Sequence, residues 1–549
     1  MVRFDRGQIL PYFSAVTGGP TIDPTDEATL TGGLRAGIQA FPAARITFSG
    51  AGGDVSLTAA ELHAAACRVA AGLAARGLSP GDVLAMQLPN VPEAVITVLA
   101  AAELGLVIVP IAHVLGATDV DFALRQSRAR ACVVAARWRG TDLLSHLAAD
   151  VRPSTLADVI VVGDELAVGC VPWSSIAAAN PARATHTPVV HDRAALLFTS
   201  GTTGRAKGVI HTQATLAAEV RQVLRFNDGE EGDVSLVSFP IGHMAGLLGV
   251  VRAFYRDRHT IVMDSWDADR AARLVEQHGV TSSAGTPVHL LSLCAAADRN
   301  GTSLASIRSF LLGATNISTG LVAAAGARGI RAFRCYGSTE QPTVSCGRPS
   351  DSLADRSRTD GRMLPGVEVR IVDEAGHEVE PGRPGEIIAR GPDLSPGYLD
   401  PRDDSADRTA DGWCRTGDIG TVDARGFLTI TDRKKDLIIR GGENIASKEV
   451  EDALHHHPDI AEVAVVGMRD ERYGERVCAV IVARGAGPSL ESIRAHVISA
   501  GLATHKAPEI VVLVDSLPRT PSGKVQKHLL RRALAATPGS TLAPGDAAD

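Results

Sequence analysis

Between Leu57 and Ala136 the chain alternates amphipathic helical segments with short apolar ones. Helices are predicted over TAAELHAAACRVAAGLAARG and VPEAVITVLAAAELG, and strands over VLAMQLP, VIVPI and ACVVAA. Strands separated by helices form parallel sheets that are covered on both faces. We therefore expect an α/β fold in which a large N-terminal domain is built from stacked, parallel-type sheets, with this first segment as scaffold.

The sequence LLFTSGTTGRAKG, residues 196 to 208, joins a predicted buried strand to a loop of small and polar residues. Glycines let the backbone turn tightly enough to aim several N–H groups at one anion, and hydroxyls and an ammonium group add further donors. The pattern predicts a phosphate site, with a surface hairpin turn as the simpler alternative. Walker A spacing and GxGxxG are both absent, so neither common nucleotide fingerprint applies. The predicted phosphate-binding residues are Thr199, Ser200, Gly201, Thr202, Thr203, Gly204 and Lys207.

Charge and composition exclude several classes of function. The chain is 45% hydrophobic and 21% charged, and its net charge of -7 gives no reason to expect nucleic acid as a partner. Its apolar stretches fall short of the roughly 18 unbroken residues that a transmembrane helix needs. The N-terminus does not resemble a signal peptide. Eight cysteines without a CxxC pair favour a reducing cytoplasm as the location.

Small and polar residues follow several predicted strands in the middle of the chain. His243 lies after the strand near Val234 to Phe239, and Ser282 to Pro287 and Phe310 to Thr315 each open from an apolar run into small residues. Ligands bind outside the carboxyl ends of strands in open α/β sheets, so we expect these loops to share one crevice with the phosphate loop.

A further strand, Phe333 to Cys335, leads into YGSTEQP. In the expected crevice Tyr336 offers a ring for stacking, Thr339 a hydroxyl for phosphate, and Glu340 a hard oxygen for Mg²⁺. Each of these residues, taken alone, fits an ordinary turn equally well.

The C-terminal third changes character. Residues 359 to 391 are strand-rich and predict a small antiparallel barrel, and Asp418 in GWCRTGD is a plausible acceptor for both ribose hydroxyls. We expect the large domain to span residues 1 to 433, a small α+β domain residues 434 to 536, and a disordered tail residues 537 to 549. Lys524 follows a Pro-Ser-Gly turn, where a lysine is ordinarily a solvated charge.

Five motifs in this order resemble those of the adenylate-forming superfamily, which includes acyl-CoA synthetases, standalone adenylation enzymes and luciferases. They are TSGTTGRAKG, YGSTE, WCRTGD, DRKKDLIIRGGENI and PRTPSGK, and the resemblance covers roughly residues 30 to 535. Within the superfamily, WDADRAARLVEQHGV, YGSTEQP, GRMLPGVEVRIVD and LPRTPSGKVQK are most similar to the cyclohexanecarboxylate-CoA ligase branch.

The resemblance implies a two-step reaction with ATP, Mg²⁺ and coenzyme A. A carboxylate attacks the α-phosphate of ATP to give acyl-AMP, and after the small domain rotates, CoA displaces AMP to give a thioester. Lys435 would be the hinge of that rotation. The implied catalytic residues are Lys524, His243, Thr339 and Glu340, with Glu340 also holding Mg²⁺.

The resemblance also implies the remaining ligand contacts. The phosphate loop would hold the β and γ phosphates, and the small domain would present glycines to the pantetheine of CoA. The implied nucleotide and CoA contacts outside the phosphate loop are Gly313, Ala314, Tyr336, Gly337, Ser338, Thr339, Asp418, Arg433, Lys435, Gly441, Gly442 and Lys524.

The acyl pocket is expected at His243 to Leu247, Gly285 to Val288 and Gly313 to Thr315. Ser235 to Leu247 contains no acidic residue to pair with an ammonium group, so an amino acid substrate is disfavoured. Met244 stands where dihydroxybenzoate-activating relatives have asparagine. We expect an apolar alicyclic, medium-chain or aromatic acid.

Two alternatives stay open at this point. The acceptor could be an acyl carrier protein instead of CoA, although the compact hinge-to-glycine segment favours CoA. The chain could also be a nucleotide-binding partner protein without catalysis, although Lys524 and Glu340 are both present. A homodimer is one expected assembly.

Overall fold

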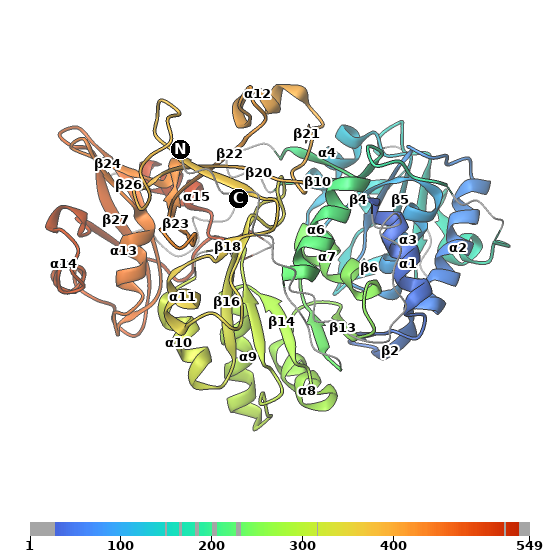
Figure 1. Cartoon of the computed structure of the whole chain (residues 1–549), viewed down its shortest axis with the longest axis horizontal. Coiled ribbons are helices and arrows are strands. Elements are labelled where there is room, and N and C mark those ends of the chain that lie inside the picture. Colours follow the sequence, from blue (N-terminus) through green and yellow to red (C-terminus); the bar gives the residue numbers. More distant parts are fainter. Residues whose placement is uncertain are drawn as a thin grey trace, which may run out of the picture.

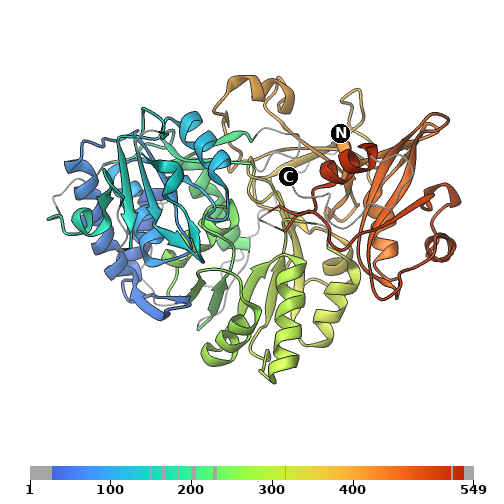
Figure 2. The same ribbon diagram turned by 180° about the vertical axis from the view of Figure 1, so that it is seen from behind.

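The computed structural model describes residues 28–148, 151–163, 167–181, 186–199, 206–226, 232–315, 317–520 and 523–536. Three lobes surround a central region, with the C-terminal residues in a lobe of their own beside the antiparallel part of the chain (Figures 1 and 2). The side chains of residues 405, 406 and 536 are not described, and neither is the expected tail from residue 537.

The first lobe is built on an eight-stranded sheet. Strands β10, β4, β3, β5, β8 and β9 run parallel, whereas β11 and β21 are antiparallel at one edge. The sheet order is β21 (Gly397–Tyr398), β11 (Gly208–Thr212), β10 (Arg193–Phe198), β4 (Val107–Pro110), β3 (Val83–Gln87), β5 (Ala131–Ala135), β8 (Asp158–Val162) and β9 (Val171–Pro172). The associated helices are α1 (Leu30–Ala40), α2 (Ala59–Ala75), α3 (Pro92–Leu104), α4 (Ala117–Ser127), α5 (Trp173–Ala177), α6 (Gln213–Phe226) and α7 (Met244–Val251), and β6 (Arg137–Trp138) with β7 (Thr141–Asp142) forms a separate ribbon.

The second lobe contains a nine-stranded sheet with a parallel centre. Parallel pairing joins β16, β15, β14, β12, β13 and β1, and antiparallel strands close both edges. The order is β18 (Arg362–Met363), β17 (Ser345–Cys346), β16 (Arg331–Tyr336), β15 (Ser309–Leu312), β14 (Ser282–Gly285), β12 (Val234–Val237), β13 (His259–Met263), β1 (Arg45–Gly50) and β2 (Gly53–Thr58). Its helices are α8 (Ala268–His278), α9 (Pro287–Asn300), α10 (Thr319–Ala327) and α11 (Leu353–Arg358). The expected stacked, parallel-type sheets are confirmed.

Local sequence explains where two of these helices begin. Thr58 and Glu61 form a reciprocal capping box at the start of α2, and Asp267 accepts from the Arg270 amide at the start of α8. These side chains satisfy backbone N–H groups that have no partner inside the helix.

A third, four-stranded sheet is antiparallel, as the strand-rich sequence predicts. Its order is β19 (Glu368–Val372), β20 (Gly385–Arg390), β22 (Cys414–Val422) and β23 (Leu428–Arg433), and α12 (Asp404–Asp407) precedes β22. The expected closed barrel is not formed, because no pairing joins β19 to β23 within the described chain. Backbone bonds between Leu428 and residues 360 and 361 occupy the outer side of β23 instead.

The C-terminal lobe is the expected α+β unit. A five-stranded sheet contains β25 (Glu443–Ile445), β24 (Ile438–Arg440), β27 (Gly474–Ala483) and β26 (Ile460–Asp470), with β28 (Ile510–Leu513) paired to β27. Helices α13 (Ser447–Leu454), α14 (Leu490–Ser499) and α15 (Lys527–Ala536) accompany it. Alternate faces of β26 and β27 pack into two separate apolar clusters, so both faces of this sheet are covered.

No helix in the described ranges combines the length and the apolar character needed to cross a membrane.

Glu103 connects three helices of the first lobe. Its buried carboxylate, on α3, receives hydrogen bonds from Arg35 of α1 at 2.8 and 3.0 Å and lies 3.1 Å from the His63 Nε2 of α2. Burial alone would raise the pKa of Glu103, but the bonds from His63 and Arg35 outweigh it and lower the pKa to about 2. Contacts with Cys67 and then Glu103 raise the pKa of His63 to about 9.

We expect Glu103→Gln to lower the free energy of unfolding by about 2 kcal/mol, less than for a fully buried pair because Arg35 and His63 are partly exposed. The stabilisation from charged His63 is complete below its unfolded pKa of about 6.5 and is lost as pH rises through about 9. The variant should show a smaller loss, because the contact with Cys67 is kept and only the contribution of Glu103 is removed. Urea unfolding between pH 6 and 9.5 measures both effects. Asp121→Asn, which breaks the exposed pair with Arg125, is the control and should unfold like wild type.

Candidate functional site

The loops predicted to converge do leave one edge of the nine-stranded sheet. Strands β12, β14, β15 and β16 are parallel neighbours, so the residues that follow them emerge at the same edge. His243 follows β12, Gly285 ends β14, Gly313 and Ala314 follow β15, and Tyr336 ends β16. Ala314 has a left-handed backbone (φ 69°), which costs a non-glycine residue about 1 kcal/mol or more, and such strained residues often cluster at functional sites.

Tyr336, Asp418 and Arg433 form one bonded group. The Tyr336 hydroxyl donates to Asp418 Oδ2 at 2.7 Å, and Arg433 Nε donates to Asp418 Oδ1 at 2.7 Å. Asp418 and Arg433 face each other across the β22–β23 pair. Burial raises the pKa of Tyr336 well above its ordinary value, so the phenol keeps its proton. The second and third sheets thus supply adjoining parts of one polar site.

The loop of residues 337 to 343 is a tight turn built on Ser338. The Ser338 amide donates to the Gln341 carbonyl at 2.8 Å, and the Ser338 hydroxyl accepts from the amides of Glu340 and Gln341 at 3.2 Å each. Gly337 is required there, because a Cβ would lie 2.0 Å from the Pro342 carbonyl oxygen. The turn fixes the backbone from which Thr339 and Glu340 project.

Two residues that sequence reasoning missed hold Glu340 beside Lys207. The Tyr398 hydroxyl lies 2.8 Å from Glu340 Oε1 and 2.9 Å from Asp407 Oδ2, and Lys207 Nζ lies 2.5 Å from the same Asp407 oxygen. The ammonium also sits 4.9 Å from the centre of the Tyr398 ring. Tyr398 reaches this point because β21 pairs with β11, directly after Lys207.

The first and last residues of the phosphate loop come together at the ends of β10 and β11. The Thr199 amide donates to the Lys207 carbonyl at 3.0 Å, and the Lys207 amide donates to Thr199 Oγ1 at 3.2 Å. The predicted residues Ser200, Gly201, Thr202, Thr203 and Gly204 lie outside the described ranges.

His211 of β11 supports the loop of residues 337 to 343. Its Nε2 lies 2.8 Å from the Thr339 carbonyl and its Nδ1 3.1 Å from Thr215 Oγ1. Burial lowers the pKa of His211 to about 4, so the ring is neutral and Nε2 carries the proton it donates to Thr339. A polar residue in the otherwise apolar strand VIHT was the signal in the sequence.

His243 lies at the N-cap of α7, immediately before the first helical residue, Met244. Asn90 fixes the preceding segment, since its side chain accepts from the Ile241 amide at 2.7 Å and donates to the Phe239 carbonyl at 2.9 Å. The His243 Nε2 is buried and has no hydrogen-bond partner in the described chain. Burial first, and then the charge of Lys524, lowers the pKa of His243.

Lys524 reaches this site from the C-terminal lobe. Its turn is closed by the Thr520 amide, which donates to the Lys524 carbonyl at 2.8 Å, and by a bridge between Arg519 and Val525. Burial and then the positive charge of Arg433 lower the pKa of Lys524, while Asp418 and Glu340 oppose that shift. Of the described residues, none forms an ion pair with its ammonium. Lys524, an exposed residue of the C-terminal lobe, therefore lies within electrostatic range of His243 and Glu340 beside the nine-stranded sheet and of Asp418 and Arg433 on the third sheet.

Lys435, Gly441 and Gly442 lie at and beyond the connection between the third sheet and the C-terminal lobe. Residues Lys434–Asp436 form a single 3₁₀ turn between β23 and β24, and burial, then Arg433, lowers the pKa of Lys435 to about 8. Both glycines are exposed and have left-handed backbones, with φ of 59° and 91°. Within the described ranges, neither glycine contacts a residue of the site described above.

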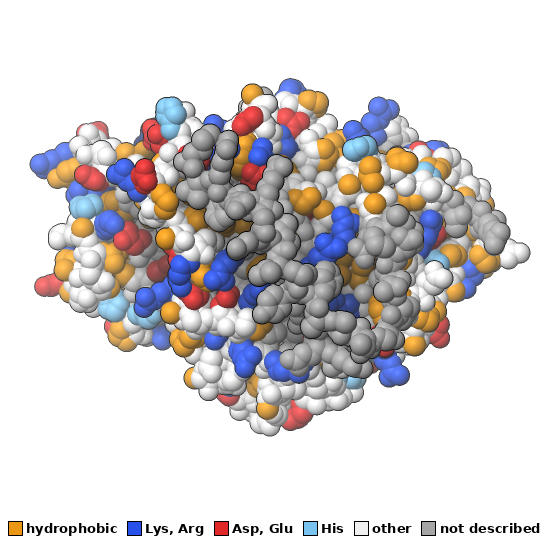
Figure 3. All heavy atoms as spheres, in the orientation of Figure 1, with side chains coloured by type: hydrophobic (Ala, Val, Ile, Leu, Met, Phe, Trp, Pro, Cys, Tyr) orange, Lys and Arg blue, Asp and Glu red, His pale blue; other side chains and the backbone are white. Residues whose placement is uncertain are grey.

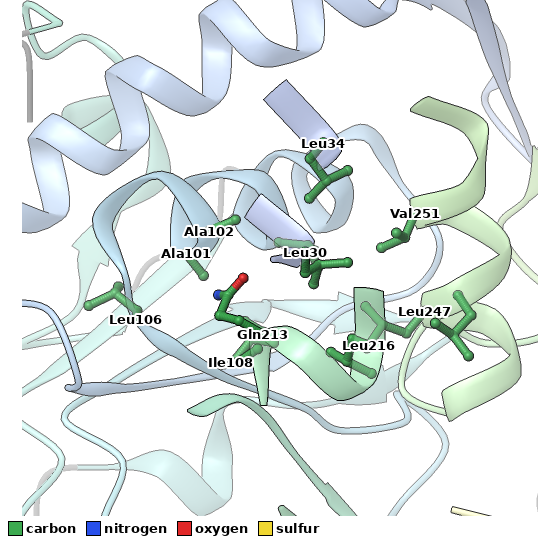
Figure 4. Close-up of a pocket in the computed structure, with 13 residues that line it drawn as sticks. Leu30, Leu34, Ala101, Ala102, Leu106, Ile108, Gln213, Leu216, Leu247 and Val251 are labelled. Carbon is green, nitrogen blue, oxygen red and sulfur yellow. The ribbon is translucent and has the colours of Figure 1, made fainter. Parts of the chain in front are cut away.

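A small apolar cavity lies away from this edge, inside the first lobe (Figure 4). Leu30 and Leu34 of α1, Leu216 of α6, and Leu247 and Val251 of α7 point into it. Leu247, expected at the acyl pocket, is thus buried against this cavity. On the outside, basic side chains lie near the middle of the face shown in Figure 3, although the chain as a whole is acidic.

Comparison with known proteins agrees with this arrangement. The AMP-binding enzyme family matches residues 34–399, and the AMP-binding enzyme C-terminal domain matches residues 449–524. The chain is 36% identical to a medium-chain fatty-acid–CoA ligase of Escherichia coli, over 86% of this chain and 84% of that protein. It is 33% identical to an indoleacetate–CoA ligase of Aromatoleum aromaticum, over 87% and 93%.

Among solved structures, ATP-bound MatB from Rhodopseudomonas palustris superposes with a TM-score of 0.81 at 29% identity, covering 92% of this chain and 98% of that one. The chain therefore belongs to the AMP-binding enzyme family, and within it to the AMP-forming acid–CoA ligases.

Proposed function

We propose that this protein is an ATP-dependent carboxylic acid:CoA ligase that works through an acyl-AMP intermediate. The observation that carries the proposal is the position of Lys524, whose ammonium comes from the small lobe and acts on His243, Arg433, Asp418 and Glu340. A mobile lobe that supplies a cation to a polar edge fits a reaction between two anions.

The proposed nucleotide contacts follow from the geometry. Asp418, already bonded to Tyr336 and Arg433, has carboxylate lone pairs left for the ribose hydroxyls, with Arg433 beside it. Tyr336, Gly313 and Ala314 would line the adenine, with Gly337 and Ser338 next to it. Thr339 would contact the α-phosphate, and Lys207 with Thr199 to Gly204 would hold the outer phosphates. That the similar MatB structure holds ATP supports ATP as the ligand.

The donor set fits Mg²⁺. Glu340 and Asp407 present carboxylate oxygens on either side of the Tyr398 hydroxyl, and Mg²⁺ takes hard oxygens, usually one or two protein carboxylates with phosphate and water. When bound there, the ion would neutralise charge on the outer phosphates. The chain's own part is to hold Glu340 in place through Tyr398 and the Ser338 turn.

The first step joins two anions. A carboxylate oxygen bonds to the α-phosphorus, the bond from that phosphorus to the bridging oxygen breaks, and pyrophosphate leaves. Preorganised cations lower the barrier because negative charge concentrates on the reacting phosphoryl group. Lys524, which has no ion-pair partner among the described residues and lies within electrostatic range of both His243 and Glu340, would bridge the carboxylate and the α-phosphate.

The second step needs space where Lys524 sits. The CoA sulfur bonds to the acyl carbon, the carbon–oxygen bond to AMP breaks, and the thiol proton is released. Rotation at Lys435 would withdraw Lys524 and bring in Gly441 and Gly442, whose missing side chains leave room for pantetheine. In the orientation of the small lobe proposed for the first step, Lys524 lies at the site and the two glycines do not, which agrees with their exposed position here.

The proposed acid is apolar: alicyclic, medium-chain or aromatic. No acidic residue occurs in the expected pocket segments, and Met244 and Gly285 are buried there. The two relatives described above are named for a medium-chain and an aromatic acid. An alicyclic acid follows from the resemblance to the cyclohexanecarboxylate branch, which stays a prediction. Transfer to an acyl carrier protein is the second candidate, and acyl-AMP formation without thioester would favour it.

We expect Lys524→Ala to reduce acid-dependent exchange of pyrophosphate into ATP at least 100-fold, because the bridging cation is lost. Thioester formation from added acyl-AMP and CoA should fall much less. The proposed step needs the charged amine. Because the pKa of Lys524 is lowered, wild-type exchange should decline as pH rises, and the midpoint of this decline should lie below the ordinary lysine pKa of about 10.4.

Lys506→Ala is the matched control. Lys506 lies in the same lobe but forms its ion pair with Glu449, which is not one of the site residues. Exchange that persists in Lys524→Ala at the wild-type rate would contradict the proposed role.

A panel of acids scored by AMP release, with and without CoA, tests the substrate class. Cyclohexanecarboxylate, octanoate and phenylacetate should each support CoA-dependent AMP release, with kcat/KM values within about 200-fold because one methylene changes binding by only about 1 to 3 kcal/mol. 8-Aminooctanoate should be at least 100-fold poorer than octanoate, since its buried ammonium would lack a carboxylate partner. Preference for the amino acid would overturn the apolar assignment.

A further inference from the structure

Two carboxyl groups lie buried directly behind the loop that carries Thr339 and Glu340. Glu219 on α6 and Asp393 after β20 are exposed by only 1% and 0%. Thr343 Oγ1 donates to Glu219 Oε1 at 2.8 Å, and Gln341 Nε2 donates to Asp393 Oδ1 at 3.1 Å. The Thr343 backbone also bonds to Asp393. Both carboxyl groups therefore hold the same short segment, residues 341 to 343.

The group formed by Glu219, Asp393 and Gln341 contains more buried hydrogen-bond acceptors than donors to satisfy them. Glu219 Oε2, Asp393 Oδ2 and Gln341 Oε1 are all buried without a hydrogen-bond partner in the part of the chain that the structure describes. Each is an acceptor when the carboxyl groups are ionised, and an unmet buried acceptor is costly. A proton on either carboxyl group turns one of these oxygens into a donor.

The surrounding charges do not remove the need for that proton. Arg252 attracts Glu219 but donates its Nε to the Leu248 carbonyl at 3.0 Å. The other titratable groups nearby are Cys335 on β16 and Cys346 on β17, with Asp360 acting on Cys335. Burial raises the pKa of the Cys335 thiol to about 12, so it stays neutral, and Asp360 adds negative charge.

Electrostatics agrees with the geometry. Burial, and then repulsion from Asp393, raises the pKa of Glu219 to about 7. Burial raises the pKa of Asp393 to about 6. Both shifts favour the protonated carboxyl groups up to near-neutral pH.

We propose that Glu219 and Asp393 share a proton and that this protonated pair fixes the loop bearing Thr339 and Glu340 in its nucleotide-binding position. The two acids are positioning residues, because they act through Gln341 and Thr343. When the proton leaves, two neighbouring buried carboxylates repel each other and the segment they hold is displaced. Only the identity of what the loop binds rests on the proposed function.

Thermal unfolding tests the shared proton without any activity assay. Because both pKa values are raised in the folded protein, the stability that the pair contributes is complete below about pH 4 and is lost as pH rises through about 7. The folding constant should fall by up to about tenfold per pH unit for each extra proton bound. Buried histidines such as His211 and His243, whose pKa values are lowered, change stability in the opposite direction in both proteins, so the comparison is between variants. We expect the Tm of wild type to fall relative to that of E219Q/D393N between pH 5 and 7.5.

E374Q/E378Q is the matched control, because it removes the same number of charges from exposed positions of the third sheet's first turn and should keep the wild-type slope. A wild-type slope in E219Q/D393N would overturn the shared proton. So would a Tm that follows the K⁺ concentration, at constant ionic strength, instead of pH, since a bound cation would then neutralise the pair.

Pyrophosphate exchange tests the positioning role. From pH 6.5 to 8.5 the wild-type KM for ATP with Mg²⁺ should rise several-fold with a smaller change in kcat. D393N, which mimics the protonated group, should keep a low KM at both pH values, whereas D393A should have a raised KM at both. A pH-independent wild-type KM would overturn the positioning role. Absence of exchange in wild type with every acid would instead refute the proposed function, and the Tm result would stand.

Discussion

Contact between two sheets at a single loop is the constraint on which the site depends. Residues 337 to 343 leave the nine-stranded sheet, but they are held by groups tied to the eight-stranded one, since His211 of β11 donates to the Thr339 carbonyl and Tyr398 of β21 bonds to Glu340. A buried polar group that loses its partner costs about 1 to 3 kcal/mol. These bonds therefore favour one relative placement of the two sheets, and with it one placement of Thr339 and Glu340.

The same junction explains how an acidic chain can present cations to an anionic ligand. Lys207 and Arg433 each rest against a carboxylate, Asp407 and Asp418 respectively, so neither cation is left unpaired within the described structure. A phosphate group that approached Lys207 would compete with Asp407, and a cation beside Glu340 would compensate Asp407 in turn. Each cation thus has a carboxylate partner that a phosphate ligand could replace. A paired cation costs less free energy to bury than an isolated one would.

The sequence predicted the sheets, the strand ends and most of the residues gathered at them, because motif spacing and hydrophobic periodicity are local signals. It did not predict His211, Tyr398, Asp407, Glu219 or Asp393. Each of these acts through a partner far away in sequence; Lys207 and Asp407, for example, are 200 positions apart. The expected barrel failed for a related reason, since residues 360 and 361 occupy the side of β23 that closure would have needed. Pairing partners of this kind come from tertiary packing, which composition and periodicity do not encode.

Lys524, the proposed catalytic lysine, lies on a lobe that polar contacts join to the rest of the chain. Next to the connecting turn, Asp432 accepts from the Ser447 amide at 2.5 Å and Lys448 donates to the Ile430 carbonyl at 2.8 Å. Water can replace such bonds with little net change in free energy, whereas separating a large apolar interface would not be compensated in this way. In the proposed mechanism, a lysine built into either large sheet would remain over the acyl group in both half-reactions. A polar, replaceable interface would therefore suit a cation that the proposal needs in the first step and must remove for the second.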